Sequence, residues 1–387
     1  MRNQKINSLE ILRGLACILV LISHFRVATK YFRNPSYDWI QLFTAWGKES
    51  VIIFFMLSGM VINLATQKTT GRLIYFKKRA IRIIPIYYVI IGISIFLCII
   101  FSTSMNIENV LGNVFFLGTQ QKYVVSTIPY NQAVWSISCE MFFYLVFGLL
   151  LSFNRRKAMI GWLMVSILAM FLLPMLKTNT SGWLLHILYM FSMSFIWIIG
   201  FFIYEFRHLF KVSMPTAILS LLLIPLAGRI HTGIAFDYKY HLLALYLIPF
   251  FSFLIQTKEN PQQKFINFKY AYVVLLYIPA LALFLNFTKS TNANILLYSI
   301  VPISSLLFYL PSIKKVFLGL YHYVAPFLIY VGSISYAIYL IHVPVMYFTS
   351  KVFPQNMVFG ILFILATVAI LSILLEKIMQ PRIAKLF

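Results

Sequence analysis

The chain has few charged residues and very few acidic ones. Only 11% of its 387 residues are charged and nine are Asp or Glu, whereas about 25% of the residues of an ordinary soluble domain are charged. Hydrophobic residues make up 61% of the sequence. This composition excludes an ordinary soluble protein and predicts a polytopic membrane protein.

Cysteines are also scarce. Cys17, Cys98 and Cys139 each lie inside an apolar run, without the paired spacing of a disulfide framework or a zinc site. We interpret them as small apolar fillers and expect no metal site and no permanently bound cofactor.

Long polar stretches are missing. Those at 26–48, 102–134 and 257–269 are too short to fold alone. The sequence shows neither an internal repeat nor a pair of corresponding Gly/Pro-broken helices, which would indicate a transporter built from inverted halves. We expect residues 1–387 to form one integral-membrane domain with no appended soluble domain.

Apolar runs long enough to span a bilayer recur along the whole chain. Several are short, so we expect an all-α bundle of about 10 to 12 transmembrane helices. The runs are 9–25, 50–66, 84–101, 135–152, 158–176, 183–204, 213–227, 241–256, 270–286, 294–311, 327–348 and 357–375.

The basic residues predict the orientation. With a cytoplasmic amino terminus, the predicted inside segments hold 21 of the 32 Lys and Arg residues. This bias places both termini in the cytoplasm. Anchoring against anionic lipid then explains most of the net charge of +23 without a nucleic-acid partner.

The first apolar run contains Arg13 and His24, eleven positions apart. Eleven steps return to within about 20° of the same helix face and advance about 16 Å. An arginine at the centre of a membrane helix costs roughly 2.5 to 3.5 kcal/mol, so it persists where it has a partner. The alternatives are that Arg13 snorkels to the cytoplasmic interface and that His24 is a satisfied interior group.

Glu140 is the acidic residue that the sequence places inside an apolar run. A buried carboxylate needs a partner, and His24 is expected at a similar depth. A His24–Glu140 pair is therefore predicted, with a purely structural interhelix hydrogen bond as the alternative.

A third polar group lies near the end of the chain. Tyr336, Tyr339 and His342 are spaced i, i+3, i+6 and share a helix face. For His342 we favour packing or substrate orientation over catalysis, because such a stripe is also typical of an interhelix contact.

Together these motifs resemble the bacterial integral-membrane acyltransferase family 3, whose members O-acylate surface polysaccharides and lipopolysaccharide. The matching residues span essentially the whole chain. They are Arg13-x10-His24, Gly47-x3-Val51-x2-Phe54-Phe55-Met56-Leu57-Ser58-Gly59, Arg79-x2-Arg82, Trp135-Ser136-x3-Glu140-x2-Phe143-Tyr144 and Ser333-Ile334-Ser335-Tyr336-x2-Tyr339-Leu340-x-His342.

The resemblance implies a membrane O-acyltransferase of the bacterial inner membrane. The donor is a cytosolic acyl-CoA, with acetyl as the default group, and the acceptor is a glycan or lipid-linked glycan such as O-antigen, capsule or exopolysaccharide. The implied donor-binding residues are Arg13, Arg79 and Arg82, since CoA phosphates need cations.

The implied catalytic residues are His24 and Glu140. His24 is the general base on the acceptor hydroxyl and Glu140 fixes its tautomer, while an acyl-histidine intermediate is the alternative. The substrate-orienting candidates are Trp135, Ser136, Tyr336, Tyr339 and His342.

Two other functional classes remain open. A transporter or flippase of an anionic lipid-linked sugar explains a basic inner face without chemistry, although scarce intramembrane carboxylates weaken an ion-coupled version. An enzyme of the unrelated membrane-bound O-acyltransferase type lacks the early Arg-x10-His pair. A non-enzymatic scaffold gives no reason to place Arg13, His24 and Glu140 in lipid.

Overall fold

The computed structural model describes residues 2–28, 47–67, 71–176, 182–228, 239–256, 266–268, 307, 310–354 and 356–387. The predicted run 270–286 and nearly all of run 294–311 lie outside the described residues. The number of transmembrane helices therefore stays a prediction.

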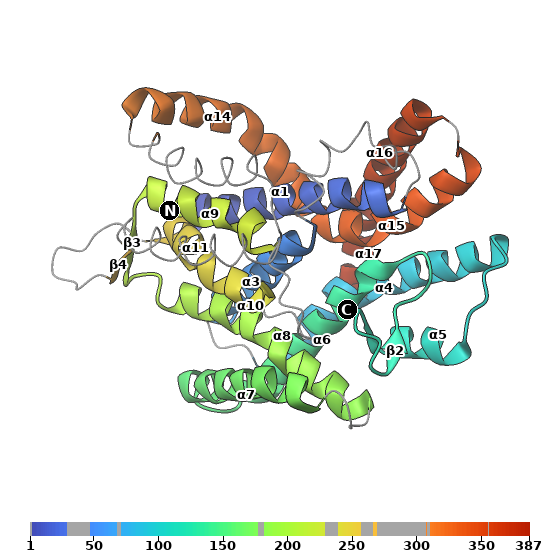
Figure 1. Ribbon diagram of the computed structural model, residues 1–387, viewed down its shortest axis with the longest axis horizontal. Helices are drawn as coiled ribbons and strands as arrows, with labels where there is room; N and C mark the ends of the chain where they lie inside the picture. The colour runs from blue at the N-terminus through green and yellow to red at the C-terminus, as the bar shows by residue number, and fades with distance from the viewer. Residues whose placement is uncertain are drawn as a thin grey trace. The chain divides into compact units, whose positions relative to one another are not determined.

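The described chain is an all-α helical bundle, as predicted (Figure 1). Its strands form two short parallel pairs, β1 (Gly118–Thr119) with β2 (Val125–Ser126) and β3 (Phe210–Val212) with β4 (Ile266–Phe268). The helices are α1 (Arg2–Ala28), α3 (Gly47–Ala65), α4 (Arg72–Ile100), α5 (Ile107–Val114), the 3₁₀-helix η2 (Gln132–Val134), α6 (Trp135–Leu150), α7 (Arg155–Leu176), α8 (Gly182–Glu205), α9 (Met214–Gly228), α10 (Lys239–Tyr246), α11 (Ile248–Ile255), α14 (Pro311–Ser333), α15 (Ser335–Val352), α16 (Met357–Ile373), the π-helix η4 (Leu374–Met379) and α17 (Gln380–Leu386).

The helices are long enough for a multi-pass membrane protein. Six in the described part of the chain are long and apolar enough to cross a bilayer, or seven if one bent pair is counted as one span. The bent pair is α14 and α15, which meet at 74°. The predicted run 327–348 is therefore not one straight helix.

The break between α14 and α15 has a local cause. Ile334 leaves the helical conformation, with φ −117° and ψ 9°. The Ser335 hydroxyl donates to the Gly332 carbonyl at 2.7 Å. A backbone acceptor at the break is thereby satisfied without water, as membrane depth requires.

The chain divides into two compact units. Unit 1 comprises residues 1–15, 48–67 and 196–330, and unit 2 comprises residues 16–47, 68–195 and 331–387. In unit 1, α9 packs against α10 and α11. In unit 2, α15 packs against α16 and α4, while α4 also packs against α6 and α17 (Figure 1).

Two glycines allow α3 and α8 to approach closely within unit 1. A Cβ atom on Gly59 would lie 2.1 Å from the Trp197 carbonyl oxygen, and one on Gly200 would lie 2.1 Å from the Met56 carbonyl oxygen. The Trp197 indole also donates to the Ser58 hydroxyl at 3.1 Å. Small residues bring membrane helices into this kind of backbone contact, where dispersion replaces the hydrophobic effect.

We expect Gly59→Ala to lower stability by roughly 1 to 3 kcal/mol, because the added methyl group collides with a backbone carbonyl. The matched control is Gly161→Ala, whose new Cβ atom would meet nothing within 4 Å. Thermal unfolding of the detergent-purified proteins compares the two variants. Equal unfolding temperatures for both would contradict the close approach.

Candidate active site

Helix α15 carries the polar stripe that organises unit 2. The Tyr336 hydroxyl donates to the Ile83 carbonyl on α4 at 3.0 Å. The Tyr339 and Ser136 hydroxyls are 2.7 Å apart, which connects α15 to α6. His342 meets His24 on α1, so the stripe contacts three different helices.

The two histidines form a close pair. Nε2 of His342 lies 3.3 Å from Nδ1 of His24, and the rings meet edge to face with centroids 4.9 Å apart. Each Nδ1 atom also contacts the backbone carbonyl four residues earlier on its own helix. These distances are 2.9 Å from His24 to Val20 and 3.0 Å from His342 to Ile338.

These contacts assign the protons of the neutral pair. A carbonyl oxygen can only accept, so Nδ1 of each ring carries the hydrogen. The Nε2 lone pair of His342 then accepts from Nδ1–H of His24. In the described part of the chain all hydrogen-bonding contacts of His24 are made by Nδ1, which leaves its Nε2 with a lone pair for chemistry.

Ser23, the residue before His24, is closely packed. The Ser23 hydroxyl donates to the Val20 carbonyl at 2.7 Å. A Cβ atom on Gly47, the first residue of α3, would lie 2.2 Å from the Ser23 hydroxyl oxygen. Gly47 therefore leaves the room that the Ser23 side chain occupies.

The cationic part of the site lies on α4. Both terminal nitrogens of Arg82 donate to the Glu376 carboxylate of η4, and its guanidinium lies 5.5 Å from the centre of the Tyr336 ring. The Glu376 side chain is only 3% exposed, against 40% for Arg82. Glu376 thus neutralises one of the three predicted donor-binding cations.

Arg79 is less completely paired. Its guanidinium lies 5.8 Å from the centre of the Tyr144 ring. Its Nε atom is buried and has no hydrogen-bond acceptor among the described residues. Buried donors are rarely left unsatisfied, so Arg79 has a hydrogen bond to offer an anion.

Glu140 is half-buried on α6 and accepts a hydrogen bond from the Tyr144 hydroxyl one turn later. The ring of the same tyrosine lies under the Arg79 guanidinium, so Tyr144 connects Glu140 with Arg79. The imidazole partner that the structure records for His24 is His342. The His24–Glu140 pair stays a prediction.

Most of the predicted site residues fall within unit 2, while Arg13 belongs to unit 1. Arg13 donates to Glu10, one turn before it, at 2.6 Å. Trp135 is buried at the start of α6. The predicted site residues in unit 2 are His24, Arg79, Arg82, Trp135, Ser136, Glu140, Tyr336, Tyr339 and His342.

Sequence reasoning missed Glu376. It placed this carboxylate at the end of an apolar run, whereas the apolar helix continues through η4 and α17 to Leu386. The available signal was the rarity of acidic residues. The chain has only nine acidic residues, so a carboxylate next to an apolar run indicates a cationic partner.

The described residues include no group of three His, Cys, Asp or Glu side chains that could hold a metal ion. The arrangement is an imidazole with an available nitrogen, positioned by a second imidazole, together with two guanidinium groups. It suits proton transfer near an anionic ligand.

Comparison with known proteins identifies the family of the chain. Residues 6–376 match the acyltransferase domain family. The chain belongs to this family. Within the acyltransferase family, it is 25% identical over 187 residues to nodulation protein 10 of Rhizobium leguminosarum bv. viciae.

That match covers 42% of this chain and 49% of nodulation protein 10, so the two align over about half of the relative's length. No solved structure matches the chain. The family is defined by an acyltransferase domain, and the long apolar helices indicate a multi-pass membrane protein.

We expect Arg82→Gln to destabilise the protein by about 2 kcal/mol. Removing one partner of a fully buried ion pair costs roughly 3 to 5 kcal/mol, and the exposure of Arg82 reduces that penalty. Glu376→Gln in the same chain should recover most of the loss, because the buried carboxylate no longer lacks its cation. Thermal unfolding of the wild type, both single variants and the double variant measures this cycle.

The same cycle separates stability from donor binding at Arg82. If Arg82 also binds the donor, the stable double variant keeps a raised KM for acyl-CoA. Single variants as stable as the wild type would show that the pair contributes nothing to the fold.

Proposed function

We propose that this membrane acyltransferase is an O-acyltransferase that moves an acyl group, by default acetyl, from cytosolic acyl-CoA to a hydroxyl of a surface polysaccharide. The acceptor classes are O-antigen, capsule and exopolysaccharide, and the location is the bacterial inner membrane. The observation that carries the proposal is the His24 imidazole, whose Nδ1 is occupied by Val20 and His342 while Nε2 keeps its lone pair.

In the proposed reaction, Nε2 of His24 takes the proton of the acceptor hydroxyl. The hydroxyl oxygen attacks the thioester carbonyl carbon, the new C–O bond forms and the C–S bond breaks. The departing sulfur takes the proton back from Nε2, so free coenzyme A and the ester are released and His24 is restored. General base catalysis of this kind contributes typically about 10²- to 10⁴-fold in rate.

His342 is the positioning residue in this proposal. Its own Nδ1–H is fixed on the Ile338 carbonyl, so its Nε2 accepts from His24 throughout the cycle. That contact stabilises the imidazolium that forms when His24 takes a proton, as the orienting group of a base pair does. Glu140, the orienting residue predicted from the sequence, lies on α6 close enough to Tyr336 and Tyr339 of the stripe to interact with them electrostatically.

Donor binding is assigned to α4. Arg79 offers its buried Nε to a phosphate of the coenzyme, and planar guanidinium groups bind phosphate with paired hydrogen bonds. Arg82 shares its charge with Glu376. Arg13, already bonded to Glu10, is a supporting cation on the same helix as His24.

The acceptor is assigned to the polar stripe. The hydroxyls of Ser136 and Tyr339 form one pair between α6 and α15, and the Tyr339 ring lies next to His342, with centroids 5.9 Å apart. Trp135 and Tyr336 complete the set of orienting residues. In the acyl-histidine alternative, Nε2 attacks the thioester first and the hydroxyl then attacks the acyl-imidazole.

We expect His24→Ala to abolish acetylation of the surface glycan, while Arg79→Ala reduces it. Proton NMR of polysaccharide purified from cells with matched membrane levels of each form measures acetyl content. His24→Ala with wild-type acetylation would remove His24 as the base. If no form acetylates the glycan, the flippase alternative or another acyl group gains weight.

We expect His342→Leu to lower kcat about tenfold with little change in the KM for acyl-CoA. The physical reason is the loss of one hydrogen bond of about 1.4 kcal/mol that is strongest when His24 is protonated. His342→Gln, whose amide oxygen can accept from Nδ1–H, should restore most of the rate. Thiol release from acyl-CoA in membrane vesicles, followed across pH, gives both constants.

A merely structural His342 would give a different result. Its leucine and glutamine variants would then lose activity together with protein level, and the pH profile of the remaining activity would match that of the wild type.

A further inference from the structure

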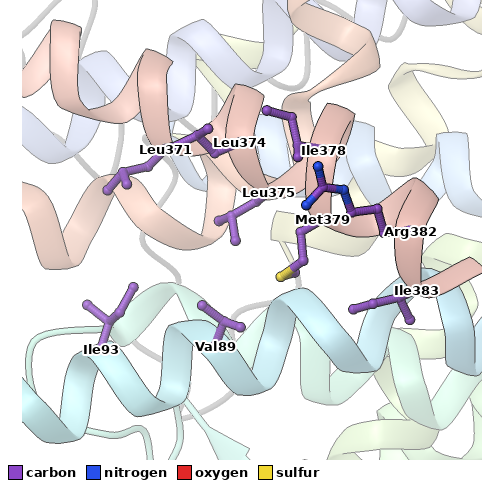
Figure 2. Close-up of a pocket in the computed structure, with 9 residues that line it drawn as sticks. All are labelled: Val89, Ile93, Leu371, Leu374, Leu375, Ile378, Met379, Arg382 and Ile383. Atoms are coloured by element: carbon purple, nitrogen blue, oxygen red, sulfur yellow. The ribbon is translucent and has the colours of Figure 1, made fainter.

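A long apolar groove runs between α4 and the carboxyl-terminal helices of unit 2. Its volume is about 430 Å³, within the range of small-molecule sites. Figure 2 shows the two walls facing one another across the groove. The lining residues are Val89, Ile93, Leu371, Leu374, Leu375, Ile378, Met379, Arg382 and Ile383.

The lining has one charged residue. Arg382 lies with Ile383 at one end of the groove, and Ile93 and Leu371 lie at the other (Figure 2). Everything between them is aliphatic or methionine. A ligand that complements this arrangement has a hydrocarbon chain and an anionic group at one end.

The groove is open to the surroundings of the helix bundle. Val89, Leu374 and Ile378 remain 38%, 44% and 42% exposed, although they belong to helices long and apolar enough to cross a membrane. Exposed apolar side chains on such helices face hydrocarbon. The groove is therefore accessible from the bilayer.

The π-helix η4 builds much of one wall. Leu374, Leu375, Ile378 and Met379 line the groove, whereas Glu376 of the same element pairs with Arg82. Lys377 donates to the Ser333 hydroxyl at 2.8 Å. Single π-helical turns are rare and occur frequently at functional sites. Here the apolar side chains of η4 line the groove, while Glu376 bonds to Arg82 on α4 and Lys377 bonds to Ser333 on α14.

We propose that this groove binds one anionic phospholipid, with an acyl chain between α4 and η4 and the phosphate on Arg382. The bilayer supplies hydrocarbon chains at high local concentration, and a guanidinium group binds phosphate with paired hydrogen bonds. Lys385, exposed one turn later on α17, adds charge of the same sign. A net anionic headgroup satisfies both cations better than a zwitterionic one, whose amine opposes them.

The site is distinct from the imidazole pair, and its occupancy can be measured without acyl transfer. The probe is an equimolar mixture of phosphatidylglycerol and phosphatidylcholine. The full chain is reconstituted in vesicles of that mixture and re-extracted in mild detergent, and lipid retained on the protein is read by native mass spectrometry.

Groove-filling variants test the chain-binding part. Val89→Trp and Leu374→Trp place an indole in the groove, and we expect each to reduce retained lipid at least fivefold. The matched control is Leu362→Trp, an equally apolar change at a 61% exposed position of α16 that does not line the groove. Loss of lipid in the control to the same extent, or full retention in both filled variants, overturns the proposal.

Headgroup variants test the phosphate contact. Arg382→Gln should reduce the preference for phosphatidylglycerol about fivefold, which corresponds to the about 1 kcal/mol that one basic residue contributes next to anionic lipid. Lys385→Gln is the control and should change it less. Equal effects of the two changes would mean diffuse attraction and overturn the assignment of the phosphate to Arg382.

The acyl donor is the competing occupant. If a long-chain acyl-CoA displaces the retained lipid, and the tryptophan variants raise the KM for that donor, the groove belongs to the donor site and the phospholipid assignment is wrong. Retained lipid in a His24→Ala protein that transfers no acyl group supports the groove independently of the proposed reaction.

Discussion

Polar side chains at membrane depth cannot use water as a partner, and this constraint organises unit 2. The Nδ1–H groups of His24 and His342 each donate a hydrogen bond to a carbonyl of their own helix, and the two side chains meet across the helices at 3.3 Å. Arg82 meets the buried Glu376 carboxylate. The histidine pair connects α1 with α15, and the Arg82–Glu376 pair connects α4 with η4, so the requirement that satisfies these groups also holds helices together.

Helix α15 is central to this arrangement because it begins at a break. The chain bends by 74° after Ser333, so the stripe of Tyr336, Tyr339 and His342 lies on a helix that runs in a different direction from α14. One helix then joins the guanidinium groups at one end of the stripe to the imidazole pair at the other. The proposed transfer from acyl-CoA would use this separation, since the phosphates of the coenzyme and the thioester carbonyl lie far apart on the same molecule.

The Arg82–Glu376 pair has two roles. It stabilises the fold by neutralising a carboxylate that is 3% exposed, and it fixes one side of the proposed anion site beside Arg79. The unpaired Nε of Arg79 is the opposite case, a buried donor that the described protein leaves unsatisfied. Arg82 and Arg79 are three residues apart on α4. The charge of Arg82 is already compensated by Glu376, whereas Arg79 still has a hydrogen-bond donor that suits a ligand.

The sequence by itself determined the class of protein and the positions of most helices, and it drew attention to His24 and His342 because a titratable side chain in an apolar run is costly and conspicuous. Arg79 and Arg82 lie before the run 84–101 and were predicted from the family resemblance, and the roles of all four residues stay predictions. The sequence could not determine the partners. Glu140 was predicted to orient His24, and the recorded imidazole contact is His342; Glu376 looked like the end of a run and lies inside a helix. Partner choice depends on which helices become neighbours and at what depth, and only the tertiary structure decided that.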